Sequence, residues 1–340
     1  MNMKKTAIGI DLGGTTIKFA WITESGEVTE QWVEPTPVHD HGSQIVPTIL
    51  ASLQNKMKAH GLTPGDFFGI GMGSPGAVDH QAGTVTGAYN LNWTKTVHIK
   101  QQIESALNLP FVLDNDANVA ALGEQWKGAG NNAADVVFVT LGTGVGGGVI
   151  SRGKLVRGVS GAAGEIGHIK VEPNGFPCTC GGTGCLETVA SATGIVNLAK
   201  AEAESFAGTS GLAQLIMKEE AVSAKIIFDR ARQKDPFAEL VLQKVGGYLG
   251  IACANIANIL NPSAIVLGGG VSKAGELLLH YVRPYFEQHA FPSVKETTSL
   301  RIATLENTAG VLGAGLLVFK QVETDETVKQ HVQIQQRTGA

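Results

Sequence analysis

The residues best suited to chemistry in this sequence begin in a short loop near the N-terminus. The apolar run Ile8–Leu12 predicts a buried strand, and Gly13-Gly14 after it predicts a tight turn. Without a Cβ, these glycines let backbone N–H groups approach an anion, and Thr15 and Lys18 add a hydroxyl donor and a positive charge. Asp11, at the strand end, is suited to hold a hydrated Mg²⁺ against the same phosphates. An ordinary surface turn is the alternative interpretation.

The same pattern occurs a second time in the middle of the chain. Val137–Leu141 is followed by Gly142-Thr143-Gly144 and then by another apolar run. A repeated strand–loop–strand unit indicates a duplicated domain, with both loops facing one nucleotide. Gly71–Gly76 and Gly142–Gly147 also match G-x-G-x-x-G, but neither is expected to open a helix, so a dinucleotide fingerprint is rejected.

Three cysteines lie within eight residues, at Cys178, Cys180 and Cys185, in a glycine-rich stretch. His168 precedes the first of them by ten residues. Three thiolates and one imidazole are the ligands of a closed, tetrahedral, structural Zn²⁺ site, and the tight spacing favours this interpretation over three buried reduced thiols.

Carboxylates complete the candidate chemistry. Asp116 follows the predicted strand 110–113 and stands beside Asn115, where it is placed to act as a general base; a simple helix cap is the alternative. Glu165 and Glu187 flank the cysteines and suit a ligand rich in hydroxyl groups, although each taken singly is an ordinary surface glutamate.

Composition limits the class of protein. The chain has 340 residues, of which 43% are hydrophobic and 16% charged, with a net charge of −4, so two α/β domains are expected and nucleic acid is not an expected partner. Asp11 interrupts any N-terminal signal sequence, and asparagines and Pro262 divide the uncharged run 245–272 into a helix and a strand. We therefore expect a cytoplasmic protein that does not enter the membrane.

Periodicity predicts strands and helices that alternate along most of the chain. In the second half it predicts one continuous helix over 187–203 and a long helix over 237–260, in which Cys253 belongs to the core. A last helix is expected over 310–319, followed by a polar, frayed end.

Four segments together resemble the ROK family of repressors, open reading frames and sugar kinases. They are Asp11–Thr15, Leu141–Gly144, Glu165–His168 and Cys178–Glu187. The likeness extends from about residue 4 to residue 320, and the cysteine block is its most specific part. Within the family the chain is most similar to the bacterial ATP-dependent glucokinases.

This resemblance implies an α/β, two-domain actin/hexokinase-like ATPase fold, made of duplicated ribonuclease H-like domains with an interdomain cleft. A small α/β domain would cover 1–118 plus about 306–320, and a large α/β domain with the zinc site would cover 119–305. Residues 321–340 would form a polar C-terminal tail.

The resemblance also implies roles for individual residues. Asp116 would be the catalytic base, and His168 would bind zinc through one ring nitrogen and the sugar through the other. The sugar would contact Gly76, Asn90, Asn115, Asp116, Glu165, His168 and Glu187. ATP and Mg²⁺ would contact Asp11, Gly13, Gly14, Thr15, Lys18, Gly142, Thr143, Gly144, Gly269 and Gly270. The zinc ligands would be His168, Cys178, Cys180 and Cys185.

The implied reaction transfers the γ-phosphate of ATP to the 6-hydroxyl of D-glucose, giving glucose 6-phosphate, in a homo-oligomer that is a dimer or tetramer. Fructose, mannose or N-acetylmannosamine as substrate, and polyphosphate as donor, remain open. A sugar-responsive regulator is disfavoured, because only about seven residues precede Ile8 and a helix-turn-helix would not fit there. An actin-like structural ATPase is disfavoured by the sugar-type Asn and Glu residues.

Overall fold

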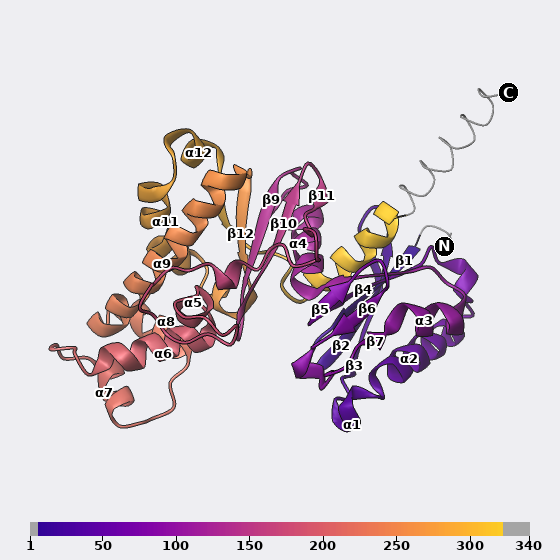
Figure 1. Ribbon diagram of the computed structural model, residues 1–340, viewed down its shortest axis with the longest axis horizontal. Coiled ribbons are helices and arrows are strands. Elements are labelled where there is room, and N and C mark those ends of the chain that lie inside the picture. Colours follow the sequence, from indigo (N-terminus) through magenta and orange to yellow (C-terminus); the bar gives the residue numbers. More distant parts are fainter. Residues whose placement is uncertain (1–5, 322–340) are drawn as a thin grey trace. The chain divides into compact units, whose positions relative to one another are not determined.

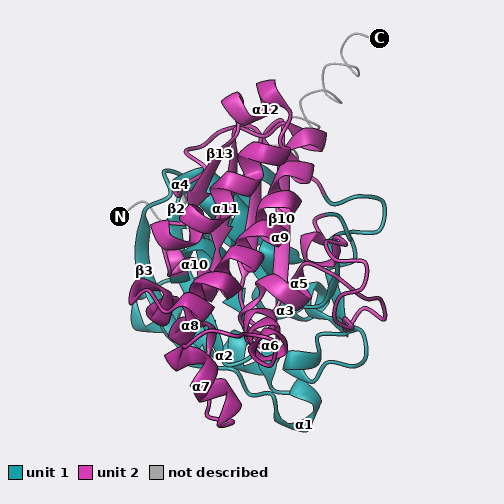
Figure 2. Cartoon of the chain, turned by 90° about the vertical axis from the view of Figure 1, so that its left-hand side faces the viewer, with its two compact units in different colours: residues 1–127, 157–163, 307–340 teal, residues 128–156, 164–306 magenta. Residues whose placement is uncertain are grey.

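A computed structural model describes residues 6–321, which form two compact units (Figures 1 and 2). Unit 1 contains residues 6–127, 157–163 and 307–321, and unit 2 contains 128–156 and 164–306. The chain therefore passes from one unit to the other four times. Most of the expected polar tail lies outside the described residues.

Unit 1 is built on a five-stranded sheet in the order β3-β2-β1-β4-β8. The first three strands are antiparallel, whereas β4 and β8 run parallel to β1. These strands are β1 (Thr6–Leu12), β2 (Thr16–Thr23), β3 (Val28–Pro35), β4 (Ile70–Ser74) and β8 (Phe111–Asn115). A small sheet adds β5 (Ala77–Asp79), β6 (Thr84–Thr86) and β7 (Val97–His98). The unit also contains helices α1 (His39–Gly42), α2 (Ile45–Ala59), α3 (Ile99–Leu107), α4 (Asp116–Lys127) and a helix over 309–321.

Alternate residues of β1 face opposite layers of unit 1, as the pleat of a strand requires. Ile8, Ile10 and Leu12 are buried in one core cluster with aliphatic residues of α2 and α3, which lie side by side (Figure 1). Gly9 faces the other layer, where a Cβ would lie only 2.1 Å from the carbonyl oxygen of Val311. The first face thus holds an aliphatic core, and the second receives a helix at backbone distance.

Glycines allow the helix 309–321 to pack closely against this second face of the sheet. A Cβ on Gly71 of β4 would lie 1.8 Å from the carbonyl oxygen of Ala314, and one on Gly123 of α4 would lie 2.0 Å from that of Ala309. In return, Gly313 packs against the backbone of Val119. Since any side chain at these positions would collide with a backbone oxygen, the glycines fix how closely sheet, α4 and helix 309–321 pack.

Unit 2 repeats the same sheet, in the order β11-β10-β9-β12-β13, again with three antiparallel strands followed by two parallel ones. Two sheets with one topology confirm the duplication predicted from the repeated loop. The strands are β9 (Val136–Leu141), β10 (Val145–Ser151), β11 (Lys154–Leu155), β12 (Ala264–Gly268) and β13 (Ser299–Ile302). The helices are α5 (Glu187–Ala190), α6 (Ala192–Ala203), α7 (Gly211–Met217), α8 (Ala224–Arg232), α9 (Pro236–Leu260), α10 (Gly269–Ser272), α11 (Glu276–His289) and α12 (Pro292–Thr297).

The long helix α9 forms the centre of the unit 2 core and packs against α11, α8 and α6. Among the described residues it is the one helix with the length and hydropathy of a membrane span, but 61% of its apolar window is buried inside the protein. Cys253 on this helix is fully buried, and burial raises the pKa of its thiol to about 12. It is a core residue, as predicted.

The prediction of one helix over 187–203 is wrong. The segment forms two helices, α5 and α6, which are separated at Ser191. Ser191 has an extended backbone (φ −71°, ψ 166°), and its hydroxyl accepts a hydrogen bond from the N–H of Gly194. A serine in this conformation ends one helix and caps the next, which apolar periodicity does not detect.

Candidate active site and metal centre

The first loop of unit 1 joins β1 to β2. Asp11 and Lys18 are opposite each other in the antiparallel register, and Lys18 Nζ donates to Asp11 Oδ2 at 3.1 Å. The N–H of Gly13 donates to the carbonyl of Thr16 and closes the turn, while Thr15 at its tip is exposed. A half-buried carboxylate beside an ammonium and a glycine turn matches the chemistry of a site for Mg²⁺ and phosphate.

Asn115 and Asp116 lie where β8 ends and α4 begins. Asn115 Oδ1 accepts hydrogen bonds from the N–H groups of Ala117 (2.9 Å) and Asn118 (3.4 Å), so Asn115 caps the helix. Asp116 Oδ1 accepts from the adjacent N–H of Ala117 at 2.8 Å. Burial, and to a smaller extent the charge of Asp11, raise the pKa of Asp116. A carboxylate with a raised pKa beside a second carboxylate has the properties of a general base.

The remaining unit 1 candidates lie in the loops after β4. Gly76 has φ +93° between β4 and β5, and Asn90 belongs to the short 3₁₀ turn Tyr89–Leu91. A Cβ on Gly14 would lie 3.4 Å from Asn90 Nδ2, so Asn90 borders the first loop. Unit 1 therefore gathers Asp11, the glycine turn, Asn90 and Asp116 at the carboxyl ends of neighbouring strands, the edge where α/β sheets commonly bind ligands.

The second loop, in unit 2, joins β9 to β10. The N–H of Gly142 donates to the carbonyl of Gly144, and the carbonyl of Gly142 accepts from the N–H of Ala192 at the start of α6. Glu187 Oε2 accepts from the N–H of Val145 at 2.9 Å, and a Cβ on Gly144 would lie 2.4 Å from the same oxygen. A pocket of about 360 Å³ lies beside this loop, lined also by Cys178 and Asn197.

Gly269 and Gly270 follow β12 and begin α10. A Cβ on Gly269 would lie 2.6 Å from the carbonyl oxygen of Leu141, so Gly269 packs against the residue before the second loop, whereas Gly270 faces open space. The structure thus brings Gly142–Gly144, Glu187 and Gly269 together within unit 2.

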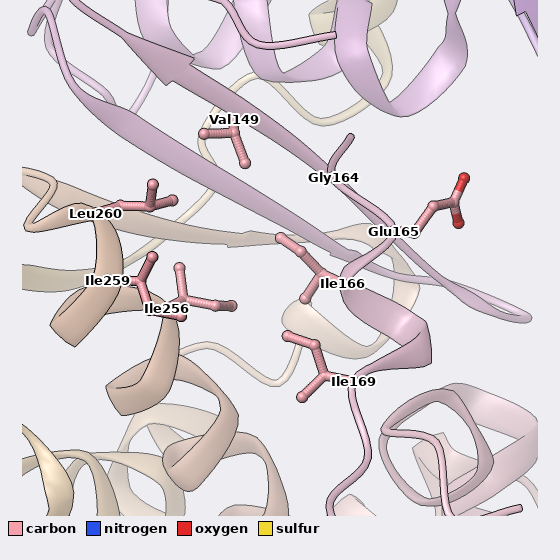
Figure 3. Close-up of a pocket in the computed structure, with 8 residues that line it drawn as sticks. All are labelled: Val149, Gly164, Glu165, Ile166, Ile169, Ile256, Ile259 and Leu260. Atoms are coloured by element: carbon pink, nitrogen blue, oxygen red, sulfur yellow. The ribbon is translucent and has the colours of Figure 1, made fainter. Parts of the chain in front are cut away.

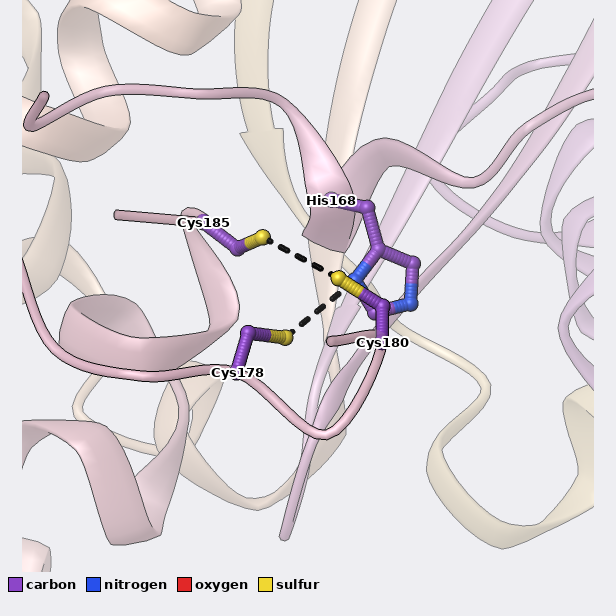
Figure 4. Close-up of side chains that lie close together, drawn as sticks. All are labelled: His168, Cys178, Cys180 and Cys185. Atoms are coloured by element: carbon purple, nitrogen blue, oxygen red, sulfur yellow. Dashed lines mark hydrogen bonds between the residues drawn. The ribbon is translucent and has the colours of Figure 1, made fainter. Parts of the chain in front are cut away.

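His168 has its two ring nitrogens in different surroundings. Nδ1 lies 3.5 Å from the Cys178 sulfur (Figure 4). Nε2 lies 3.7 Å from Glu165 Oε2. Glu165 precedes the 3₁₀ turn Ile166–His168, of which His168 is the last residue, so this turn brings the two side chains together. One imidazole can therefore bind a metal through Nδ1 while Nε2 and Glu165 remain for a hydroxylated ligand.

The thiols of Cys178, Cys180 and Cys185 gather around the same nitrogen, with all four ligand atoms within 4.8 Å of one another. A tetrahedral zinc site requires sulfur–sulfur edges of about 3.8 Å and sulfur–nitrogen edges of about 3.5 Å. The structure has 3.6 Å between Cys180 Sγ and Cys185 Sγ, and 3.5 Å between Cys178 Sγ and His168 Nδ1. The predicted ligand set is assembled, and its size and donors fit zinc.

Lys170 belongs to this centre and has no counterpart in the sequence-based prediction. Its Nζ donates to Cys185 Sγ at 2.9 Å, where its charge would offset part of the negative charge of three thiolates if a divalent ion were bound. A lysine two residues after His168 was the available signal, but sequence spacing alone does not show that its side chain turns toward Cys185.

Beside the turn that carries His168 lies a second, aliphatic pocket of about 230 Å³ (Figure 3). Ile166 and Ile169 form one wall, and Val149 of β10 and Ile256 of α9 form others. The Glu165 carboxylate points away from this space (Figure 3). The lining is almost entirely aliphatic and therefore poorly suited to orient a polar substrate, and Ile166 and Ile169 also pack in the core of unit 2.

Comparison with known proteins agrees with this arrangement. A model of the ROK family matches residues 7–321. The chain belongs to the ROK family. A glucokinase from Halalkalibacterium halodurans is 47% identical to it over 94% of this chain and 96% of the relative. A glucokinase from Thermotoga maritima is 34% identical over 94% of this chain and 99% of the relative.

A solved structure of the family is similar along nearly the whole chain. It is a ROK family glucokinase from Streptomyces griseus in complex with glucose and AMPPNP, with a TM-score of 0.73 and 35% identity, covering 92% of this chain and 98% of that one. The mixed α/β fold with two five-stranded sheets is thus the fold of ROK kinases, as predicted.

Proposed function

We propose that this ROK protein is an ATP-dependent glucokinase, which transfers the γ-phosphate of ATP to the 6-hydroxyl of D-glucose. The observation that carries the proposal is Asp116, a carboxylate of raised pKa at the start of α4, close enough to Asp11 to feel its charge. The 47% identity to a glucokinase over nearly the full length supports glucose as the substrate.

In the proposed reaction, Asp116 accepts the proton of the sugar 6-hydroxyl, and that oxygen attacks the γ-phosphorus in line. Asp11 holds Mg²⁺, which when bound neutralises charge on the transferring phosphate. The N–H groups and side chains of the two loops hold the phosphates, through Gly13, Gly14, Thr15, Lys18, Gly142, Thr143 and Gly144. Gly269 and Gly270 lie near the adenosine.

The residues proposed to bind the hexose carry hydrogen-bond donors and acceptors. In unit 1 these are Gly76, Asn90, Asn115 and Asp116, and in unit 2 they are Glu165, His168 and Glu187. A sugar ring presents hydroxyl groups that both donate and accept, and carboxylates with amides and an imidazole satisfy both roles. The Glu187 oxygen that accepts from Val145 is fixed by that bond, which orients the rest of the carboxylate.

Zinc has a structural role in this proposal. Cys178, Cys180, Cys185 and His168 Nδ1 bind it, which holds the imidazole ring so that Nε2 faces the sugar together with Glu165. Zinc in a four-ligand site of this kind has no open position, so it takes no direct part in phosphate transfer. We further propose that the enzyme works in the cytoplasm as a homo-oligomer.

The test is ADP release from ATP and Mg²⁺ with a panel of hexoses: glucose, fructose, mannose and N-acetylmannosamine. We expect glucose to give the highest kcat/KM. A preference for another hexose would retain the kinase and change its substrate, and polyphosphate in place of ATP tests the donor. Sugar binding without sugar-dependent ATP turnover would contradict the proposal and favour a sugar-sensing regulator.

A further inference from the structure

A buried carboxylate directly precedes the proposed site residues Asn115 and Asp116 in the chain. Asp114 is 3% exposed, and its Oδ1 accepts hydrogen bonds from the N–H of Asn115 (2.9 Å) and from Asn118 Nδ2 (2.7 Å). Its Oδ2 accepts from Arg157 Nε at 2.6 Å. Both oxygens of Asp114 are therefore engaged, one by the segment that leads into Asp116 and the other by a distant arginine.

Arg157 supplies the charge that this carboxylate requires. An ionised carboxylate removed from water is costly unless it is paired and hydrogen-bonded. The Arg157 side chain keeps 30% of its surface exposed, so it pairs with Asp114 while remaining partly hydrated. The short contact is a charge-assisted hydrogen bond, the class that best fixes geometry.

Arg157 begins a short segment of unit 1 that lies between two parts of unit 2 in the sequence. Residues 157–163 belong to unit 1, although the residues on both sides of this segment belong to unit 2. Gly161 anchors the segment again, since a Cβ there would lie 3.0 Å from the carbonyl oxygen of Val78 in β5. The chain then leads at once into Glu165 and His168.

We propose that Arg157 is a positioning residue for phosphate transfer. It acts through Asp114, whose carboxylate accepts from the N–H of Asn115 and from Asn118 Nδ2, on either side of Asp116, and it anchors segment 157–163, which precedes Glu165 and His168 in the chain. Arg157 itself does not contact substrate in this proposal, which rests on the glucokinase function proposed above. One ion pair thus joins the segment that contains Asp116 to segment 157–163 within unit 1.

The test compares Arg157→Gln, Arg157→Lys and a control, Lys56→Gln. Lys56 forms an ion pair with Glu30 at 2.7 Å, also half-buried and in unit 1, but with none of the candidate residues. Misplacement of a catalytic group by about 1 Å costs on the order of 10²-fold in rate. We therefore expect Arg157→Gln to lower kcat about 10²-fold and to raise KM for glucose, with KM for ATP within about twofold.

Rescue separates positioning from a general loss of stability. Lysine retains the charge and one donor for Asp114, so Arg157→Lys should recover at least about tenfold of the lost kcat. Lys56→Gln should leave kcat unchanged. The proposal would be overturned if Arg157→Gln kept kcat and KM for glucose close to the wild-type values. It would also be overturned if Arg157→Lys were as impaired as Arg157→Gln.

Hydrogen–deuterium exchange gives a readout that does not require activity. Peptides covering 113–118 and 157–163 should exchange faster in Arg157→Gln than in wild type or Lys56→Gln, and peptides of unit 2 helices should not change. Unchanged exchange in both segments would overturn the proposed link. If wild-type protein showed no glucose-dependent ADP release, the glucokinase function would be refuted. Hydrogen–deuterium exchange would still test whether Arg157 links the two segments.

Discussion

The two units share one sheet topology but carry different chemistry on the same hairpin. In unit 1 the β1–β2 hairpin contains Asp11 and Lys18, which pair across the turn. In unit 2 the β9–β10 hairpin, Val136–Ser151, contains no charged residue, and its counterpart to Asp11 is Thr140. Its carboxylate comes instead from Glu187, at the start of α5.

Under the proposed function, this difference would divide the work of one reaction between the two copies of the fold. Unit 1 concentrates carboxylates, which suit metal binding and proton transfer, and it raises the pKa of one of them. Unit 2 presents backbone and hydroxyl groups, the Glu165 and Glu187 carboxylates, and an imidazole that belongs to a candidate metal centre. We therefore expect substitutions in unit 1 to act mainly on kcat and those in unit 2 mainly on KM for the sugar.

Asp116→Asn should give the largest effect. General base catalysis contributes about 10²–10⁴-fold, so kcat should fall by that factor while glucose binding, measured by calorimetry, is retained. The matched substitution in unit 2, Glu187→Gln, should mainly raise KM. Near-normal turnover in Asp116→Asn would show that Asp116 is not the base. Equal effects of both variants on kcat would contradict the expected division of roles between the two units.

Loss of a zinc ligand should give the next largest effect, confined to unit 2. Cys180 is exposed, so Cys180→Ser changes a ligand without altering core packing. We expect one zinc per chain in wild type, and after dialysis about a tenth of that in Cys180→Ser, with a raised KM for glucose. Cys253→Ala is the control, because Cys253 lies in the core of α9, and it should keep its zinc. Active wild-type protein that contains no zinc would refute the metal centre.

A smaller effect is expected in the second loop. A Cβ on Gly144 would lie 2.4 Å from Glu187 Oε2, whereas one on Gly142 would have 3.9 Å to its nearest neighbour. Gly144→Ala should displace the Glu187 carboxylate and raise KM for glucose by roughly tenfold, the effect of about one lost hydrogen bond. Gly142→Ala should change it much less. Similar glucose KM values for the two variants would show that Glu187 does not depend on this contact.

The smallest effect concerns stability and pH. Since burial raises the pKa of Asp116 above that of an unfolded carboxyl group, its ionised form destabilises the folded protein at pH 7. This destabilisation decreases as the pH falls below the pKa of Asp116 in the folded protein. It is lost below the pKa that the same carboxyl group has in the unfolded chain. Ligand-free Asp116→Asn should therefore melt a few degrees above wild type at pH 7, and the difference should shrink at pH 5. A lower Tm for the variant at pH 7 would contradict the raised pKa.

Much of the fold could be predicted because local signals agree with the tertiary structure. The long helix expected over 237–260 is α9, with most of its apolar residues buried, and the repeated Leu-Gly loops revealed the duplicated sheet. The break at Ser191 could not be predicted, since the flanking residues continue the helical pattern and only the backbone angles show the cap.

The candidate site divides in the same way. The cysteine cluster was predictable because its ligands are close in sequence, and the structure assembles them. Lys170 and Arg157 were not, because a cation has no sequence signature that reveals which anion it will meet. Their partners, Cys185 and Asp114, become known only when the chain has folded.

The helix 309–321, which packs through glycines onto β1, β4 and α4, has a consequence for the order of events during translation. The ribosome completes all of unit 2 before it makes the last layer of unit 1. We therefore expect unit 1 to remain incompletely folded until residues 309–321 have been synthesised. The proposed base, Asp116, would thus gain its complete surroundings only after residues 309–321 have been made.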